Sequence, residues 1–226
     1  RRVLFRSLSS LAYIEGMYYK PLIDWEMLAK YSEGIIATGG CMLGCVSAFL
    51  VEGDKFNPSK AEERLSRFFE ILEDRFYLEL HTFPDKKQQE LNKMLMSYSG
   101  QFGVPTIAVS DSHYLRPDDW KDHELLIAAQ MGKKHDDPDR YTYGYGALAM
   151  ISEDEVRERL SSHLPSEIID KAINNTMKIA DSCNVEITGT RTFPVFFNKP
   201  DEDVEYLNKL AWQRSEEHTS ELQSRF

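Results

Sequence analysis

The sequence predicts an α/β fold built from parallel β/α units. Three short apolar runs, residues 34–38, 76–80 and 105–110, have the length of buried strands, and a stretch with helical spacing follows each of them. Strands separated by helices pair in parallel, because a long crossover must connect them. In β/α barrels made of such units, the chemistry lies where the strands end. We therefore expect the functional residues directly after these three runs.

Asp111 and His113 follow directly on the third run and are the strongest functional lead. Alternate residues of an extended segment point to the same side, so this carboxylate and imidazole can converge on one metal ion or one proton-transfer site. The structural alternative is a capped strand end, in which Asp111 accepts hydrogen bonds from backbone amides and His113 is merely packed. The Asp-x-His pattern alone leaves both interpretations open, because it is short and common.

The other two runs also end in residues that can bind metals. The first run breaks into a Gly-Gly-Cys turn that ends at Cys41, and the second is followed directly by His81. Successive parallel strands bring Cys41, His81 and the Asp111–His113 pair to one rim. This convergence favours a metal or acid/base site over three unrelated strand ends.

Helical spacing and helix-end signals predict the remaining elements. The expected helices span residues 8–19, 25–31, 42–51, 58–73, 85–102, 117–131, 152–160, 165–183 and 202–212. His123 lies in one of these helices, and a lone histidine at such a position is more often packed or exposed than ligating. Residues 133–145 form an irregular loop with three tyrosines, which we interpret as packed aromatic side chains rather than a stacking platform for bases.

The two ends of the chain are set aside from the fold prediction. Residues 214–224 back-translate, with permissible codons, to a common sequencing-adapter strand, and residues 3–7 fit the end of the partner adapter. We therefore interpret residues 1–7 and 214–226 as adapter-derived, and expect them to pack poorly against the rest. The residues between them are interpreted as an open fragment of a longer protein.

Charge and composition limit the classes of function. A formal net charge of −10 repels a phosphate backbone, so this chain is not expected to be the main nucleic-acid grip. Its three cysteines are odd in number and widely spread, which suits a reducing compartment better than a disulfide framework. No apolar run approaches the roughly twenty residues that span a membrane, and no signal peptide is visible, so we expect a cytoplasmic protein with no membrane partner.

Several strings, taken in their order and spacing, resemble one family. They are EGIIATGGCMLG at 33–44, FYLEL at 76–80, VSDSHYLR at 109–116, DHELL at 122–126 and DDP at 136–138. Together they resemble the alpha subunits of bacterial DNA polymerase III, the C family of replicative polymerases, within the polymerase-and-histidinol-phosphatase (PHP) domain. The resemblance covers nearly all of residues 8–213.

The resemblance implies a fold and a domain order. Residues 8–185 would form the C-terminal part of a PHP domain, which is a distorted, TIM-like β/α barrel and is here only partial. Residues 186–213 would form a linker and the start of the polymerase palm. In this family the aspartates that transfer nucleotides lie further downstream in the palm, where they hold magnesium, so the fragment alone is expected to be inactive.

The resemblance also implies a metal site. In this family the strand ends of the PHP domain can hold divalent metal ions, and some members resemble a proofreading 3′–5′ exonuclease. Motif matching places Cys41, Asp111 and His113 at ligand positions. A thiolate, a carboxylate and an imidazole together suit zinc, and a carboxylate-rich remainder would also admit manganese or magnesium.

The chain departs from the family pattern at three points. The loop after Leu80 does not have the usual sequence, so His81 is only a candidate for the rim of the site. Cys45 stands where the family often has an acidic residue. The family's early His-x-His and Asp-His motifs lie upstream of residue 8, so the metal site in this chain is expected to be incomplete.

For the whole protein, the resemblance implies a DNA polymerase that uses DNA and deoxynucleoside triphosphates and assembles with a sliding clamp and other replisome subunits. Two alternatives stay open. One is a free-standing, metal-dependent phosphoesterase of the PHP family, and the other is a degenerate barrel that only scaffolds the polymerase. Residues 192–212 favour the polymerase over the free-standing enzyme, because only the polymerase needs an entry into the palm.

Overall fold

The computed structural model describes residues 2–51, 53–143, 146–184, 197 and 200–223. The chain divides into two compact units, Arg1–Asn184 and Val185–Phe226. None of the helices in the described part is both long and apolar enough to cross a membrane. The first unit carries every predicted site residue.

The first unit is organised around a parallel sheet of three strands. These are β3 (Ala37–Thr38), β4 (Phe76–His81) and β5 (Thr106–Val109), in the order β3-β4-β5. Both pairings are parallel, with Thr38 opposite Tyr77 and His81 opposite Val109. The predicted α/β class, the three strands and their parallel pairing are therefore confirmed. The described residues form this open sheet and not a closed barrel.

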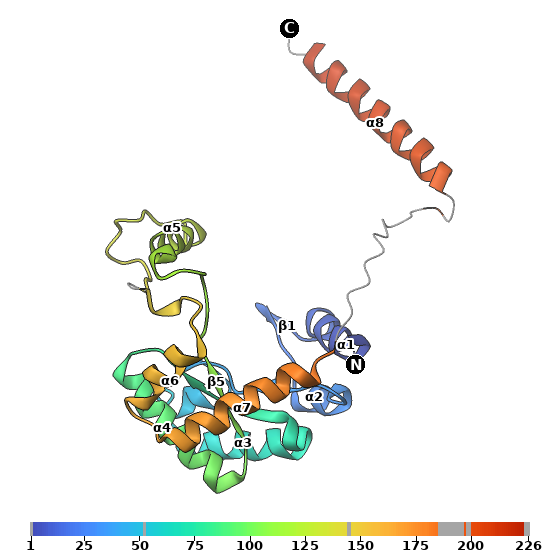
Figure 1. Ribbon diagram of the computed structural model, residues 1–226. Coiled ribbons are helices and arrows are strands. Elements are labelled where there is room, and N and C mark those ends of the chain that lie inside the picture. Colours follow the sequence, from blue (N-terminus) through green and yellow to red (C-terminus); the bar gives the residue numbers. More distant parts are fainter. Residues whose placement is uncertain (1, 52, 144–145, 185–196, 198–199, 224–226) are drawn as a thin grey trace. The chain divides into compact units, whose positions relative to one another are not determined.

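Helices cover the sheet and connect its strands (Figure 1). The α-helices of the first unit are α1 (Arg2–Ile14), α2 (Trp25–Tyr31), α3 (Pro58–Leu72), α4 (Lys86–Phe102), α5 (Trp120–Gln130), α6 (Glu153–Ser161) and α7 (Ser166–Ser182). Short 3-10 helices span η1 (Ser47–Phe49), η2 (Glu73–Arg75), η3 (Pro117–Asp119) and η4 (Gly146–Leu148). Helices α3 and α4 pack against β4, and α7 packs against β5.

The central strand β4 is buried on both faces. Phe76, Leu78 and Leu80 are fully buried in the main hydrophobic cluster, together with side chains from α3, α4, α6 and α7. Burying one side chain of this size stabilises the fold by about 1.5–3 kcal/mol. The alternate residues Glu79 and His81 face the other way and are also buried. A strand covered on both faces is typical of a parallel sheet, but charged residues on one of those faces need partners.

The first predicted helix ends earlier than its spacing indicated. Residues 8–19 were expected to form one helix, whereas α1 stops at Ile14 and the chain enters a hairpin of β1 (Met17–Tyr18) and β2 (Lys20–Pro21). Gly16 makes this possible, because a Cβ there would lie 2.0 Å from the Leu22 carbonyl oxygen. The helical spacing misled because apolar residues 17–19 lie in an exposed hairpin.

The predicted helix at residues 42–51 is wrong. The chain makes turns there, followed by η1. A tight turn closes at Gly44, whose amide donates to the Cys41 carbonyl at 2.7 Å. A Cβ at Gly44 would lie 2.0 Å from the Gly39 carbonyl oxygen, so this turn requires glycine.

The second unit contains α8 (Pro200–Gln223), which is longer than the predicted helix at 202–212. Most of the predicted linker, residues 185–196 and 198–199, lies outside the described residues, as do the side chains of residues 1–6 and 216–226. Residues 2–7 belong to α1 and residues 214–223 to α8. The interpretation of both ends as adapter-derived stays a prediction.

The edge of the sheet at β5 is closed by side chains of α7. Asn175 donates to the Thr106 carbonyl at 2.9 Å. The Thr176 hydroxyl accepts from the Ala108 amide at 3.2 Å and lies at the same distance from the Ala108 carbonyl. These contacts take the place of a fourth strand and hold β5 in register with β4.

We predict that Asn175→Ala lowers the free energy of unfolding by about 1–3 kcal/mol, because it leaves the buried Thr106 carbonyl without its donor. Urea denaturation followed by circular dichroism would measure this. Asn174→Ala is the matched control, since Asn174 is the neighbouring asparagine on the exposed side of α7. Equal stability of the two variants would contradict the role given to Asn175.

Candidate functional site at the carboxyl edge of the sheet

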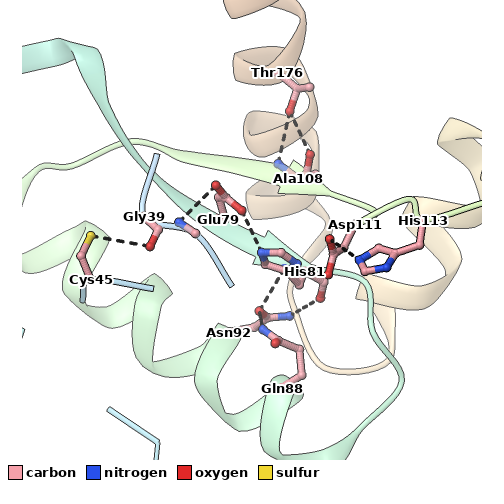
Figure 2. A network of polar contacts seen from close by, with 11 residues as sticks. Gly39, Cys45, Glu79, His81, Gln88, Asn92, Ala108, Asp111, His113 and Thr176 are labelled. Atoms are coloured by element: carbon pink, nitrogen blue, oxygen red, sulfur yellow. Dashed lines mark hydrogen bonds and ion pairs between the residues drawn. The ribbon is translucent and has the colours of Figure 1, made fainter. Parts of the chain in front are cut away.

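The three strands end side by side. Beyond β3, the Gly39 amide donates to the Tyr77 carbonyl at 2.8 Å, and beyond β4 the Thr82 amide donates to the Val109 carbonyl at 3.1 Å. The Gly-Gly-Cys turn, His81 and the segment after Val109 therefore start from one edge, as predicted. Figure 2 shows these strand ends together.

Asp111 and His113 are brought together, but not by an extended strand. His113 Nε2 lies 3.4 Å from Asp111 Oδ1, and both side chains are partly exposed. Strand β5 has ended at Val109, and Asp111 has a left-handed φ of 51°. This conformation costs free energy for most residues and less for aspartate. The pair therefore converges through a turn, and the alternation argument gave the right result for the wrong reason.

His123 of α5 joins this pair. His113 Nδ1 lies 3.3 Å from His123 Nε2, and the two rings meet edge-on with centroids 5.1 Å apart. The ring of Tyr143 packs against His113 at 5.2 Å and against His123 at 5.7 Å. Sequence reasoning expected His123 to be packed or exposed and missed this contact, because it depends on how α5 returns to the strand end.

A buried carboxylate holds the loop that carries Tyr143. Glu124, the residue after His123, is 1 % exposed. It accepts hydrogen bonds from the Arg140 guanidinium, the Thr142 hydroxyl and the Tyr143 amide, the last at 2.9 Å. These polar contacts hold the predicted irregular loop, in which Tyr143 is partly buried and Tyr141 is exposed. Tyr145 lies outside the described residues.

The environment of Tyr143 places it close to the predicted ligands. Burial raises the pKa of Tyr143 to about 12, and a hydrogen bond to Tyr141 and the negative charge of Asp111 act in the same direction. Tyr143 is therefore protonated at neutral pH, and its ring packs beside His113.

His81 faces a buried carboxylate. Its Nε2 lies 2.8 Å from Glu79 Oε2, and the Gly40 amide donates to Glu79 Oε1 at 3.1 Å (Figure 2). Burial raises the pKa of Glu79, but hydrogen bonds from His81, Thr38 and Gly40, with the charge of His81, outweigh it and the pKa is lowered. Glu79 was not predicted, although a single acid inside an apolar run is a readable signal for a buried polar partner.

Asn92 of α4 fixes the end of β4 through the backbone of His81. It donates to the His81 carbonyl at 2.8 Å and accepts from the His81 amide at 3.3 Å. Its side-chain oxygen also accepts from the Gln88 amide, and its side-chain nitrogen also contacts His163 Nε2. All the hydrogen-bonding capacity of this buried amide is thus used, which makes it a rigid clamp on the strand end.

The predicted ligands fit a divalent metal only in part. Two ligands of a tetrahedral zinc ion lie about 3.3–3.5 Å apart, so the separation of His113 Nε2 and Asp111 Oδ1 suits two of its corners. Cys41 is exposed and does not complete the set, since no group of three or more His, Cys, Asp or Glu in the described residues could hold an ion. Cys45 donates weakly to the Gly39 carbonyl, and burial raises its pKa, so it is a structural thiol.

Comparison with known proteins shows what this chain is similar to. The model of the PHP domain matches residues 2–83, which include Cys41, Glu79 and His81. DNA polymerase III subunit alpha of Thermus aquaticus is 33% identical over 180 residues, and that of Borreliella burgdorferi is 33% identical over 207 residues. The resemblance to DNA polymerase III alpha subunits, read from the sequence strings, is thus confirmed.

The similarity covers most of this chain but little of its relatives. The alignments span 80% of the chain for Thermus aquaticus, 88% for Borreliella burgdorferi and 91% for Aquifex aeolicus, the last also at 33% identity. The chain in turn spans 14%, 17% and 18% of those three alpha subunits. Asp111 and His113 lie beyond the residues matched by the PHP model but within a chain that the alpha subunits match over most of its length.

We predict that Glu79→Gln lowers the free energy of unfolding at pH 7 by about 1–3 kcal/mol, because it weakens the buried contact with His81. The folded pKa of Glu79 is below its ordinary value of 4.5, so its contribution is present above that pH and is lost as the pH falls further. The difference between the two proteins should therefore shrink in acid.

Urea denaturation between pH 3 and pH 7 would follow this difference. Glu90→Gln is the control, because Glu90 is an exposed acid on α4 that pairs with Lys93 at the surface. A difference between wild type and Glu79→Gln that stays constant across the acid range would rule out the stabilising role of the Glu79 carboxylate.

Proposed function

We propose that this chain is part of a replicative DNA polymerase that carries out DNA-templated DNA synthesis. The observation that carries the proposal is the similarity to three DNA polymerase III alpha subunits across most of the chain. The whole protein would use DNA, deoxynucleoside triphosphates and magnesium. It would work in the cytoplasm with a sliding clamp and other replisome subunits.

Within that polymerase, residues 8–185 would be the C-terminal part of a PHP domain with a distorted β/α barrel. Residues 186–213 would lead into the palm. The parallel order of β3, β4 and β5 supports a barrel segment, since a barrel is such a sheet closed on itself. The palm aspartates would come from outside this chain, so the chain itself would hold no nucleotide-transfer site.

The carboxyl edge would be a divalent metal site, with zinc or manganese held by Cys41, Asp111 and His113 and completed by ligands from the rest of the protein. The separation of the Asp111 and His113 ligand atoms supports two of these assignments. A bound divalent ion would supply Lewis acidity toward a phosphate oxygen, as a 3′–5′ exonuclease or another phosphoesterase requires. Asp111 and His113 would position it, and Tyr143 would limit the access of water on one side.

A non-catalytic scaffold is the second candidate, and one observation favours it. His81 is 4 % exposed and already satisfied by Glu79, so this edge residue needs no metal to be stable. The buried pair of Glu79 and His81 can hold this edge of the barrel together with the outer pair left unliganded. His81 would then be a structural residue at the rim rather than a ligand.

A metal titration separates these two candidates. We predict that the chain alone binds zinc and manganese weakly, because Cys41, Asp111 and His113 supply at most three ligands. A longer version that restores the upstream part of the protein should bind tightly. In it, Asp111→Asn or His113→Ala should weaken binding at least about tenfold, the low end of the loss caused even by an outer-shell partner.

Isothermal titration calorimetry with zinc and manganese would measure these affinities. Asp118→Asn is the control, because Asp118 is an exposed acid in η3 that makes no contact with the His113 ring. Tight stoichiometric binding by the chain alone, or tight binding that both site variants leave unchanged, would contradict the assigned ligands. Absence of binding in the longer version would favour the scaffold.

We also predict that the chain alone extends no primer. Incubated with a primed template, magnesium and the four deoxynucleoside triphosphates, it should give no longer product on a denaturing gel, while an intact DNA polymerase III alpha subunit should. The reason is that two-metal nucleotide transfer needs a carboxylate clamp that this chain lacks under the proposal. Template-dependent extension by the purified chain would refute this assignment of the active site.

A further inference from the structure

The imidazole of His113 faces a different partner with each ring nitrogen. Nε2 lies 3.4 Å from Asp111 Oδ1, and Nδ1 lies 3.3 Å from His123 Nε2. A neutral imidazole carries one N–H and one lone pair, so the partner of Nδ1 decides what Nε2 can do. His123 therefore lies where it can influence how His113 coordinates a metal ion without coordinating that ion itself.

We propose that His123 is a positioning residue that accepts the Nδ1–H of His113 and so leaves the Nε2 lone pair directed to the side of Asp111. The functional consequence rests on the metal site proposed above. The hydrogen bond itself does not, because it is a contact between two residues of this chain. Histidines that bind metals nearly always donate their other ring N–H to such a partner, which sets the tautomer and the ring orientation.

The opposite tautomer would prevent coordination. If His123 donated to Nδ1, the proton of His113 would sit on Nε2 and point toward the Asp111 carboxylate. Nε2 would then be a donor to Asp111 rather than a ligand, and binding would require the proton to move first. The contacts of Nε2 with Asp111 Oδ1 at 3.4 Å and of Nδ1 with His123 Nε2 at 3.3 Å are both longer than a typical hydrogen bond, so their lengths do not select the tautomer. The first separation also fits two neighbouring ligands of one ion, an arrangement that requires the lone pair on Nε2.

The surroundings of His123 hold its ring in place. Three aromatic rings contact it, those of His113 at 5.1 Å, Tyr114 at 5.4 Å and Tyr143 at 5.7 Å between centroids. The next residue of α5, the buried Glu124, ties down the loop that carries Tyr143. Two successive residues of α5 thus have different roles: His123 contacts His113, and Glu124 holds the loop that carries Tyr143.

Two substitutions separate the hydrogen bond from the packing. His123→Phe keeps an aromatic ring among its neighbours but has no acceptor for His113. His123→Gln keeps a side-chain carbonyl that can reach the same nitrogen. His135→Phe is the matched control, because His135 is an exposed histidine whose backbone carbonyl accepts from Arg140. If His123 only filled space, His123→Phe would preserve the tautomer and the metal affinity at least as well as His123→Gln.

The test is the tautomer of His113 in the metal-free chain, read from ring ¹⁵N chemical shifts at a pH where the ring is neutral. The chain has six histidines, and His113→Asn identifies the His113 signals. We expect wild type, His123→Gln and His135→Phe to carry the His113 proton on Nδ1, and His123→Phe to lose that preference. A wild-type proton on Nε2, or an unchanged tautomer in His123→Phe, would overturn the proposal.

Zinc chloride titrations of the longer version give a second readout. The affinity should fall about tenfold to a hundredfold in His123→Phe and recover in His123→Gln. An affinity that is equal in both variants would also overturn the proposal. No zinc binding in any protein, wild type included, would refute the metal site instead. The tautomer of His113 alone would then decide the role of His123. If His123→Phe fails to fold, the tautomer can still be measured in wild type and in His123→Gln.

Discussion

The parallel pairing of β4 with β3 on one side and β5 on the other determines where every candidate residue lies. Because both neighbours run in the same direction, their ends meet at one edge, and the Cys41 turn, His81 and Asp111 leave the sheet together. The pairing depends in turn on the apolar residues of β4, which are fully buried. Asn175 of α7 and Asn92 of α4 then secure the two ends of the arrangement, one at the outer edge of β5 and one at the last residue of β4. The position of the candidate site therefore depends on the packing of the hydrophobic core around β4.

Two polar networks with different properties meet at this edge. The inner one, Glu79 with His81, is buried, and the Gly40 amide also donates to Glu79. The outer one, Asp111 with His113 and His123, is partly exposed. A buried carboxylate must be matched by donors or it destabilises the fold, so the inner pair is a constraint on folding. An exposed pair pays a small desolvation cost and keeps ligand atoms available. The chemistry of the edge belongs to the outer network and its rigidity to the inner one.

Local signals in the sequence were enough for most of the fold and for half of the site. Apolar runs predicted the strands, and the helix at 25–31 was predicted to the residue because Asp24 caps it and its spacing is regular. The helix predicted at 42–51 failed because Gly44 is needed by a close backbone approach that no spacing rule contains. Asp111 and His113 were found from their position after a strand. His123 and Glu124 could not be, because their partners are ten or more residues away and are set by the return of α5 and its loop.

The inner network is hydrogen-bonded without a metal ion, which matters for whether this fold acts as a metal site or as a scaffold. Glu79 and His81 satisfy each other, and Asn92 secures the strand end without an ion. The stability of the sheet edge therefore does not require the outer ligands to be occupied. Substitutions at Cys41, Asp111 or His113 should therefore cost the fold little, since these side chains are exposed or partly exposed. Under the proposed function, the fold could persist as a scaffold without a metal ion or keep the ion at its outer residues. Under the proposed function, metal binding would depend on these outer residues and on the side chains in contact with His113, which include His123 and Tyr143.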